Sequence, residues 1–107
     1  MKGNRPNIVL IIIDALRFDR LGISGYRPAL TPNLDRLARN GVNCVNHFAV
    51  GCPSQIAIPG IFTSTLPFDW GGYNEGIRHR PYSFVELLRG AGYDTFGIAT
   101  CHWFTSH

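Results

Sequence analysis

The 107-residue chain is predicted to adopt an α/β fold in which helices flank a parallel sheet. Two observations lead to this prediction. Three segments have the apolar composition of strands, and the segments between them carry helix start and stop signals. Strands that alternate with helices are typical of parallel sheets with right-handed crossover connections. Because no internal repeat or low-complexity linker divides the sequence, we expect residues 1–107 to belong to one domain.

The first predicted strand is the unbroken aliphatic run at residues 8–13, most of it β-branched. The run is too short to span a membrane and is typical of a strand that is buried on both faces. It ends at Asp14. Ligands of open α/β sheets gather outside the carboxyl ends of the strands. Asp14 is therefore a candidate ligand for a metal or a polar substrate.

Residues 31–41 carry the clearest helix signals, with Thr31 as the N-cap, Pro32 in the first turn and Gly41 as the stop. The glycines and proline of residues 22–28, just before it, predict a loop in which any helix is short. Residues 42–50 follow as the second predicted strand.

Residues 54–63 form an apolar segment that predicts a short helix, bent or shortened at Pro59. If Ser54 opens this helix, its hydroxyl lies among unpaired backbone N–H groups, where an anion is favoured. A plain N-cap role is the simpler interpretation of Ser54. Residues 66–81 are expected to be a long ordered loop of the kind that carries specificity.

The last predicted helix begins with a capping box, in which Ser83 and Glu86 satisfy each other's backbone groups, and Gly90 and Gly92 close it. Residues 93–100 follow as the third predicted strand, with His102 just beyond its carboxyl end.

Composition excludes several classes of protein. The net charge of +3 comes from scattered basic residues, with residues 78–80 the only dense group, so we expect no nucleic-acid partner. Cys44, Cys52 and Cys101 form no C-x-x-C pair, which argues against a disulfide scaffold. The chain start leads directly into the first strand without a cleavage site, so a cytoplasmic location and no membrane partner are expected.

Several segments of the chain share the motifs of one family. These segments are residues 6–14, 21–26, 31–41 and 92–95, of which the Thr-Pro-Asn-Leu-Asp-x-Leu-Ala sequence at 31–38 is the most specific. Through them the chain resembles the N-terminal part of the sulfatases, members of the alkaline phosphatase superfamily. The resemblance implies the α/β fold of that superfamily and the hydrolysis of a sulfate or phosphate ester.

The resemblance also implies a metal site. In the family the first strand ends in two aspartates that bind a divalent cation, whereas here Asp14 is followed by Ala15. Asp14 is thus the expected metal ligand, with Ca²⁺ favoured by the family and Zn²⁺ or Mn²⁺ as alternatives. Loss of one carboxylate is expected to weaken binding of a hard cation or to change which metal is held.

The family nucleophile lies in a Cys-x-Pro-x-Arg motif, whose Cys becomes formylglycine, and Leu-Thr-Gly follows shortly after. Aligning residues 62–64 with Leu-Thr-Gly places Ser54 at the nucleophile position, beside the metal, whereas aligning residues 53–54 places Gly51 there, which has no side chain to react. Because the Pro and Arg are missing, formylglycine is not expected. A serine alkoxide would instead resemble the phosphatase and phosphodiesterase branches, and Cys52 is an alternative nucleophile.

The family carries Gly-Lys-Trp-His after its Gly-Tyr-x-Thr strand, and a gapless count places His102 at that histidine and Thr100 at the lysine. The resemblance implies that His102 contacts the transferred group or donates a proton, as its near-neutral pKa permits. An ordinary histidine without a catalytic role is the alternative.

The combined expectation is a metal-dependent hydrolase that cleaves a small-molecule or glycan sulfate or phosphate ester through covalent Ser54 and His102. Because family members are longer and supply further metal ligands downstream, we expect this chain to be an N-terminal portion, inactive alone and prone to self-association. Two alternatives are a non-catalytic truncated remnant or interaction module, and a phosphodiesterase or phosphatase.

Overall fold

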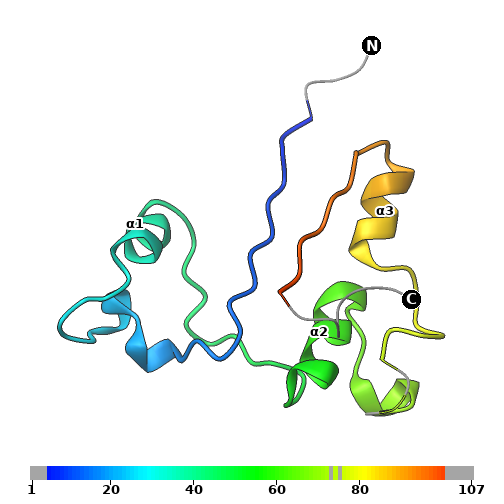
Figure 1. Cartoon of the computed structure of the whole chain (residues 1–107), viewed down its shortest axis with the longest axis horizontal. Helices are drawn as coiled ribbons and strands as arrows, with labels where there is room; N and C mark the ends of the chain where they lie inside the picture. Colours follow the sequence, from blue (N-terminus) through cyan, green and yellow to red (C-terminus); the bar gives the residue numbers. More distant parts are fainter. Residues whose placement is uncertain (1–4, 73, 75, 101–107) are drawn as a thin grey trace. The chain divides into compact units, whose positions relative to one another are not determined.

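The computed structural model describes residues 5–72, 74 and 76–100, which divide into two compact units, Met1–Asn46 and His47–His107 (Figure 1). The first unit contains the 3₁₀ helices η1 (Phe18–Arg20) and η2 (Gly22–Ser24) and the helix α1 (Pro32–Asn40). The second contains α2 (Ser54–Thr63), the 3₁₀ helix η3 (Pro67–Trp70) and α3 (Phe84–Gly90). Each unit is described by itself.

In the first unit α1 confirms the predicted helix and packs against η2. Pro32 occupies the first turn, where a missing N–H is harmless. Thr31, however, does not act through its side chain as the predicted cap. Its Oγ1 accepts a hydrogen bond from the Gly22 N–H at 3.0 Å and donates to Oδ1 of Asp35 at 3.0 Å. Thr31 therefore joins η2 to α1.

Asp35 is the most buried side chain of this unit, at 2% exposure. Its Oδ1 also accepts from the Ile23 N–H at 2.9 Å, so the carboxylate is held by both the hydroxyl of Thr31 and the backbone of η2. Buried carboxylates require such partners, because burial of an unpaired charge is unfavourable. A hydrogen-bonded polar cluster thus holds the two elements together.

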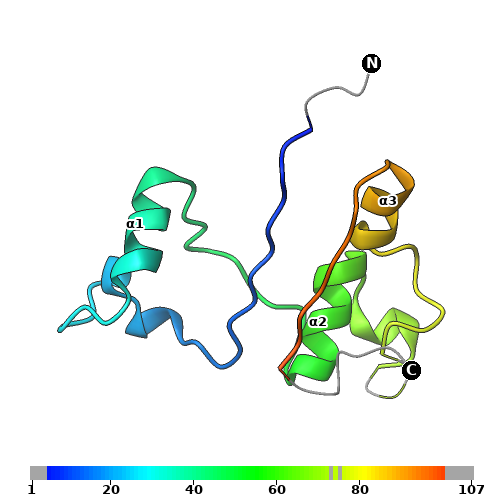
Figure 2. The ribbon, with the colours of Figure 1, turned by 45° about the horizontal axis from the view of Figure 1, so that its top comes forward.

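In the second unit α2 and α3 lie side by side in both views (Figures 1 and 2). The rings of Phe62 and Phe84 join them, with centroids 5.2 Å apart and a tilt of 40°. Ile56 of α2 is 3% exposed. Pro59 lies inside α2, which nevertheless continues to Thr63, so the predicted segment keeps its full length. Apolar packing therefore organises this unit.

The start of α3 matches the sequence prediction. The Ser83 side chain accepts from the Glu86 N–H at 3.3 Å, and the Glu86 carboxylate accepts from the Ser83 N–H at 2.7 Å. This reciprocal capping box confirms the predicted start of the helix.

The three predicted strands are not confirmed. Within residues 5–72, 74 and 76–100 the structure contains no β-strand, and residues 8–13 run as an extended segment that is 42–79% exposed (Figure 1). Residues 42–50 and 93–100 also lack strand pairing with any described residue. A strand needs a neighbouring strand for its N–H and C=O groups, and composition alone does not supply one. In the described ranges, no helix is both long and apolar enough to cross a membrane.

Candidate functional site

Asp14 lies where the extended apolar segment ends, but in a turn rather than at the end of a paired strand. The next residue, Ala15, has a φ of 56°, in the left-handed region that residues other than glycine, asparagine and aspartate rarely adopt. The chain therefore turns sharply just after the carboxylate. Asp14 is exposed, as an ion ligand at a site open to solvent would be.

The other acidic side chains of the first unit are already engaged. Arg17 binds Asp19 through two hydrogen bonds, Nε to Oδ1 at 2.9 Å and Nη2 to Oδ2 at 2.7 Å. The hydrogen bond from Arg17 lowers the pKa of Asp19, and the carboxylate in turn raises the pKa of Arg17. Asp35 is buried between η2 and α1. Neither acid is therefore positioned to join Asp14 as a ligand.

A calcium ion takes six to eight oxygen ligands, and a zinc ion about four ligands. Among the residues that the structure describes, no three His, Cys, Asp or Glu side chains are grouped so as to hold a metal ion. Asp14 and Ser54 belong to different units. The described side chains therefore do not form a complete metal site, and Asp14 is at most one ligand of it.

Ser54 is the first residue of α2 and is half-buried. The structure makes Pro53 the N-cap: its carbonyl accepts from the N–H groups of Ile56 and Ala57 at 2.9 and 3.2 Å, so the simple N-cap interpretation of Ser54 is wrong. The N–H groups at the start of a helix have no partner within it, and the helix dipole adds positive potential there. Ser54 therefore belongs to a helix end that favours an oxyanion.

The two alternative nucleophile positions have different surroundings. A Cβ atom at Gly51 would run into Cγ2 of Ile56, one of the most buried apolar side chains described, so the packing there accepts only glycine. Cys52 is exposed. The alignment that places Ser54 at the nucleophile position stays a prediction.

His102, the predicted proton donor, lies outside the described residues. Thr100, which stands at the position of the family lysine, is described and exposed. The structure thus leaves the role of His102 as a prediction.

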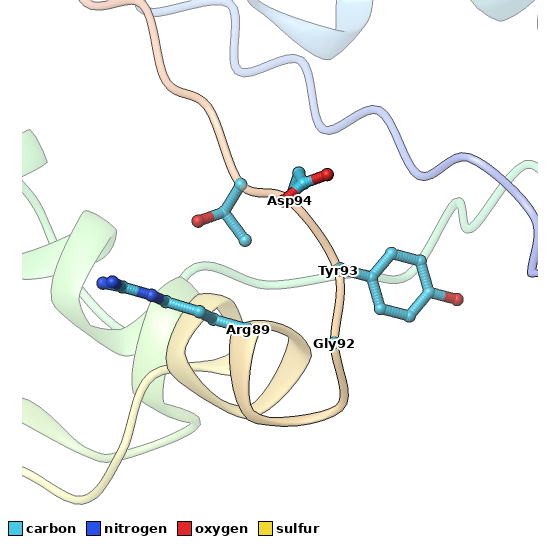
Figure 3. Close-up of a pocket in the computed structure, with 5 residues that line it drawn as sticks. Arg89, Gly92, Tyr93 and Asp94 are labelled. Carbon is cyan, nitrogen blue, oxygen red and sulfur yellow. The ribbon is translucent and has the colours of Figure 1, made fainter. Parts of the chain in front are cut away.

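An open recess of about 540 Å³ follows the end of α3 (Figure 3). Its lining includes Arg89 and Asp94, whose opposite charges offset each other. The side chains of Arg89 and Tyr93 point away from each other, so they do not converge on one point (Figure 3). None of the predicted site residues lines it. This recess is therefore a surface feature distinct from the candidate site.

Sequence reasoning missed a chain of hydrogen bonds at the C-terminal end of α2. Nη1 of Arg80 donates to Oγ1 of Thr65 at 2.7 Å, and the hydroxyls of Thr65 and Thr63 lie 2.7 Å apart. Oγ1 of Thr63 donates to the carbonyl of Pro59 at 2.7 Å. The only sequence signal was the basic group at residues 78–80, which does not reveal contacts fifteen residues away.

Comparison with known proteins places these residues in a family. A family model described as Sulfatase matches residues 6–106. Human arylsulfatase H is 31% identical over 94% of this chain and 20% of its own length. An arylsulfatase from Clostridium perfringens is 36% identical over 92% of the chain and 21% of its own length. An N-acetylgalactosamine-6-sulfatase from Sus scrofa is 30% identical over 91% of the chain and 22% of its own length.

The chain thus spans about a fifth of the length of these relatives. No solved structure matches it significantly. The match of the family model over nearly all of the sequence agrees with the motifs at residues 31–41 and 92–95. On this evidence the chain belongs to the sulfatase family.

Proposed function

We propose that the chain contributes Ser54 and Asp14 to a hydrolase that cleaves sulfate esters of a small molecule or a glycan. The observation that carries the proposal is the position of Ser54, half-buried at the first residue of α2, in a chain of the sulfatase family. The relatives are named as arylsulfatases and as an N-acetylgalactosamine sulfatase, which supports sulfate esters as the substrate class.

In the proposed reaction Ser54 loses its hydroxyl proton to solvent, and its oxygen attacks the sulfur while the bond from sulfur to the alcohol oxygen breaks. Water then attacks the sulfur, which releases hydrogen sulfate and restores the serine hydroxyl. Positive potential at the start of α2 would stabilise the charge on the sulfuryl oxygens. His102 would protonate the departing alcohol. Asp14 would be one oxygen ligand of a divalent cation, with Ca²⁺ favoured over Zn²⁺ or Mn²⁺ by the resemblance to the family, and a bound cation would supply further positive charge.

A second candidate, phosphoryl transfer, is favoured by a specific feature of α2. Ile56 and Ile58 stand where the family motif has Pro and Arg, so maturation of a formylglycine is not expected, and an unmodified serine suits the phosphatase and phosphodiesterase branches. A third candidate, a non-catalytic module, is favoured by Ala15 and Thr100, which replace a metal ligand and a cationic residue of the family.

The first experiment uses the chain itself. Hydrolysis of an aryl sulfate and an aryl phosphate is followed with Ca²⁺, Mn²⁺ or Zn²⁺ added, in parallel with Ser54→Ala. We expect both proteins to show the same background, because the described residues do not complete a metal site. Turnover that is lost in Ser54→Ala would show instead that the chain is catalytic alone.

The second experiment supplies the rest of a family member. Residues 6–106 replace the matching segment of the C. perfringens arylsulfatase, which is 36% identical to this chain. We expect the chimera to hydrolyse an ester and Ser54→Ala to abolish this activity. Faster hydrolysis of the aryl sulfate than of the aryl phosphate would support the first candidate, and the reverse would support the second. A triple change, Ser54→Cys with Ile56→Pro and Ile58→Arg, restores the family motif and controls for folding. An active triple variant beside an inactive Ser54 chimera would support the non-catalytic alternative.

A further inference from the structure

The guanidinium of Arg80 is only partly satisfied by the surrounding protein. Its Nη1 donates to Thr65 Oγ1 at 2.7 Å, whereas Nε and Nη2 are buried without a hydrogen-bond partner among the described residues. No carboxylate of those residues lies within ion-pair distance of it. Buried donors that lack a partner are unfavourable, and more so when they carry charge.

The unsatisfied atoms form a particular geometry. Nε and Nη2 lie on one edge of the planar guanidinium, and one N–H bond of each points outward from that edge, parallel to the other. Such an edge matches two oxygens of a carboxylate, sulfate or phosphate group, each oxygen accepting one hydrogen bond. The unsatisfied edge of Arg80 is therefore the edge that binds an oxyanion in a bidentate manner.

The other edge is held in place by a directional chain of hydrogen bonds. Thr63 donates its hydroxyl proton to the carbonyl of Pro59, so the proton between the two threonines must come from Thr65. Thr65 is then left to accept from Arg80. Each hydroxyl both donates and accepts, which strengthens the chain and limits rotation of the guanidinium. Arg80 is thus anchored before any ligand arrives.

A recess of about 520 Å³ adjoins this group, lined by Arg80 and by Ile77, Pro81, Tyr82, Ser83 and Glu86. The side chains of Ile77 and Tyr82 are 51% and 74% exposed, so the recess is open to solvent at these two residues. The Glu86 carboxylate opposes an anion. Its Oε2, however, is held by the Ser83 N–H at 2.7 Å and the Ser83 hydroxyl at 2.8 Å.

We propose that the Nε–Nη2 edge of Arg80, reached through this recess, is an oxyanion-binding subsite separate from Ser54. Ser54 begins α2 and Thr63 ends it, so the two ends of this helix are about 14 Å apart. Arg80 is held, through Thr65, at the Thr63 end. Resting on the proposed function, this subsite would hold a second acidic group of the ester substrate, at the far end of α2 from the reacting group.

The test observes the arginine side chain directly in the full chain. The ¹⁵N-labelled Arg80 Nε–H signal, assigned by its loss in Arg80→Lys, is followed during titration with sodium sulfate and, separately, sodium acetate, against sodium chloride at equal ionic strength. We expect a saturable shift with one or both oxyanions and none with chloride. A larger response to sulfate identifies a tetrahedral group, and a larger response to acetate identifies a carboxylate.

Matched variants separate the subsite from other cations. Because Arg80→Lys lacks the Nε–H signal, the affinity of every variant for sulfate and acetate is measured by calorimetry. Arg80→Lys keeps the charge but removes the bidentate edge, so sulfate or acetate affinity should fall about tenfold or more. Glu86→Gln keeps the capping box and removes the negative charge of the carboxylate, so the affinity for sulfate or acetate should rise. Ser54→Ala should leave anion binding at Arg80 unchanged even if it abolishes hydrolysis, which distinguishes this inference from the proposed function. Equal shifts with chloride, or unchanged affinity in Arg80→Lys, would overturn the subsite.

Discussion

The buried carboxylate of Asp35 occupies the space that a side chain at Gly22 would need. A Cβ atom at Gly22 would run into Oδ2 of Asp35, and Oδ1 of the same carboxylate binds the N–H of Ile23. The close approach of η2 to α1 thus depends on a glycine on one side and an acid on the other.

Gly22→Ala should therefore separate η2 from α1. We expect it to lower the free energy of unfolding by about 1–3 kcal/mol, the usual effect of overpacking a buried site. Asp35→Ala should weaken the same contact by a comparable amount, because it leaves the Ile23 N–H without its acceptor. Asp35→Asn keeps an acceptor oxygen and serves as the matched control. Amide hydrogen exchange at Ile23 measures the effect, and unchanged protection in both Gly22→Ala and Asp35→Ala would contradict this account.

The capping box of α3 should make the start of that helix sensitive to pH. The hydrogen bond from the Ser83 N–H, together with that from its hydroxyl, lowers the pKa of Glu86. A lowered pKa means that the ionised carboxylate stabilises the folded helix above the ordinary titration range of glutamate. This contribution is lost as the pH falls through the lowered pKa of the folded state.

The protection of the Glu86 amide against hydrogen exchange, corrected for the intrinsic pH dependence of exchange, is therefore expected to fall on acidification. Glu86→Gln, which can still form a capping box, should not lose protection in this way on acidification. An identical pH profile in the two proteins would rule out the carboxylate as the cause.

Ala15→Asp should raise affinity for a divalent cation. The left-handed backbone at this position, with a φ of 56°, tolerates aspartate better than most side chains, and the change places a second carboxylate beside Asp14. Calcium titration by calorimetry compares the unaltered chain, Ala15→Asp, and Ala15→Asp combined with Asp14→Asn. The double variant should lose the gain. Calcium binding that survives Asp14→Asn in full would exclude Asp14 as a ligand.

The exposed apolar run at residues 8–13 should promote association of the chain. Val9 and Ile11 are 79% and 72% exposed, and unpaired extended segments of this composition readily pair with one another. Ile11→Lys should reduce light scattering at a given concentration. Asn43→Lys adds the same charge at an exposed polar position and controls for net charge. Equal scattering by the two variants would show that charge, not the apolar run, controls association.

The candidate site was only partly accessible to sequence reasoning. Asp14 and Ser54 stay predictions, drawn from the end of the apolar run and from the family motifs, whereas the helix start at residue 54 follows from local signals. Thr31 is the N-cap residue of α1, as predicted, but its side chain does not cap the helix because its hydroxyl is used by Gly22 and Asp35. Arg80 was missed because its partner Thr65 is distant in sequence, and no local pattern indicates that contact.

The positions of α1, α2 and α3 and the membership of the sulfatase family could be predicted from sequence, since caps, stops and motifs act over a few neighbouring residues. The hydrogen-bond partners of Asp35 and the unpartnered edge of Arg80 became visible only in the folded chain. It also left residues 8–13 exposed rather than in a sheet. Helices close their hydrogen bonds within themselves, whereas strands and buried polar groups depend on partners far away in the chain.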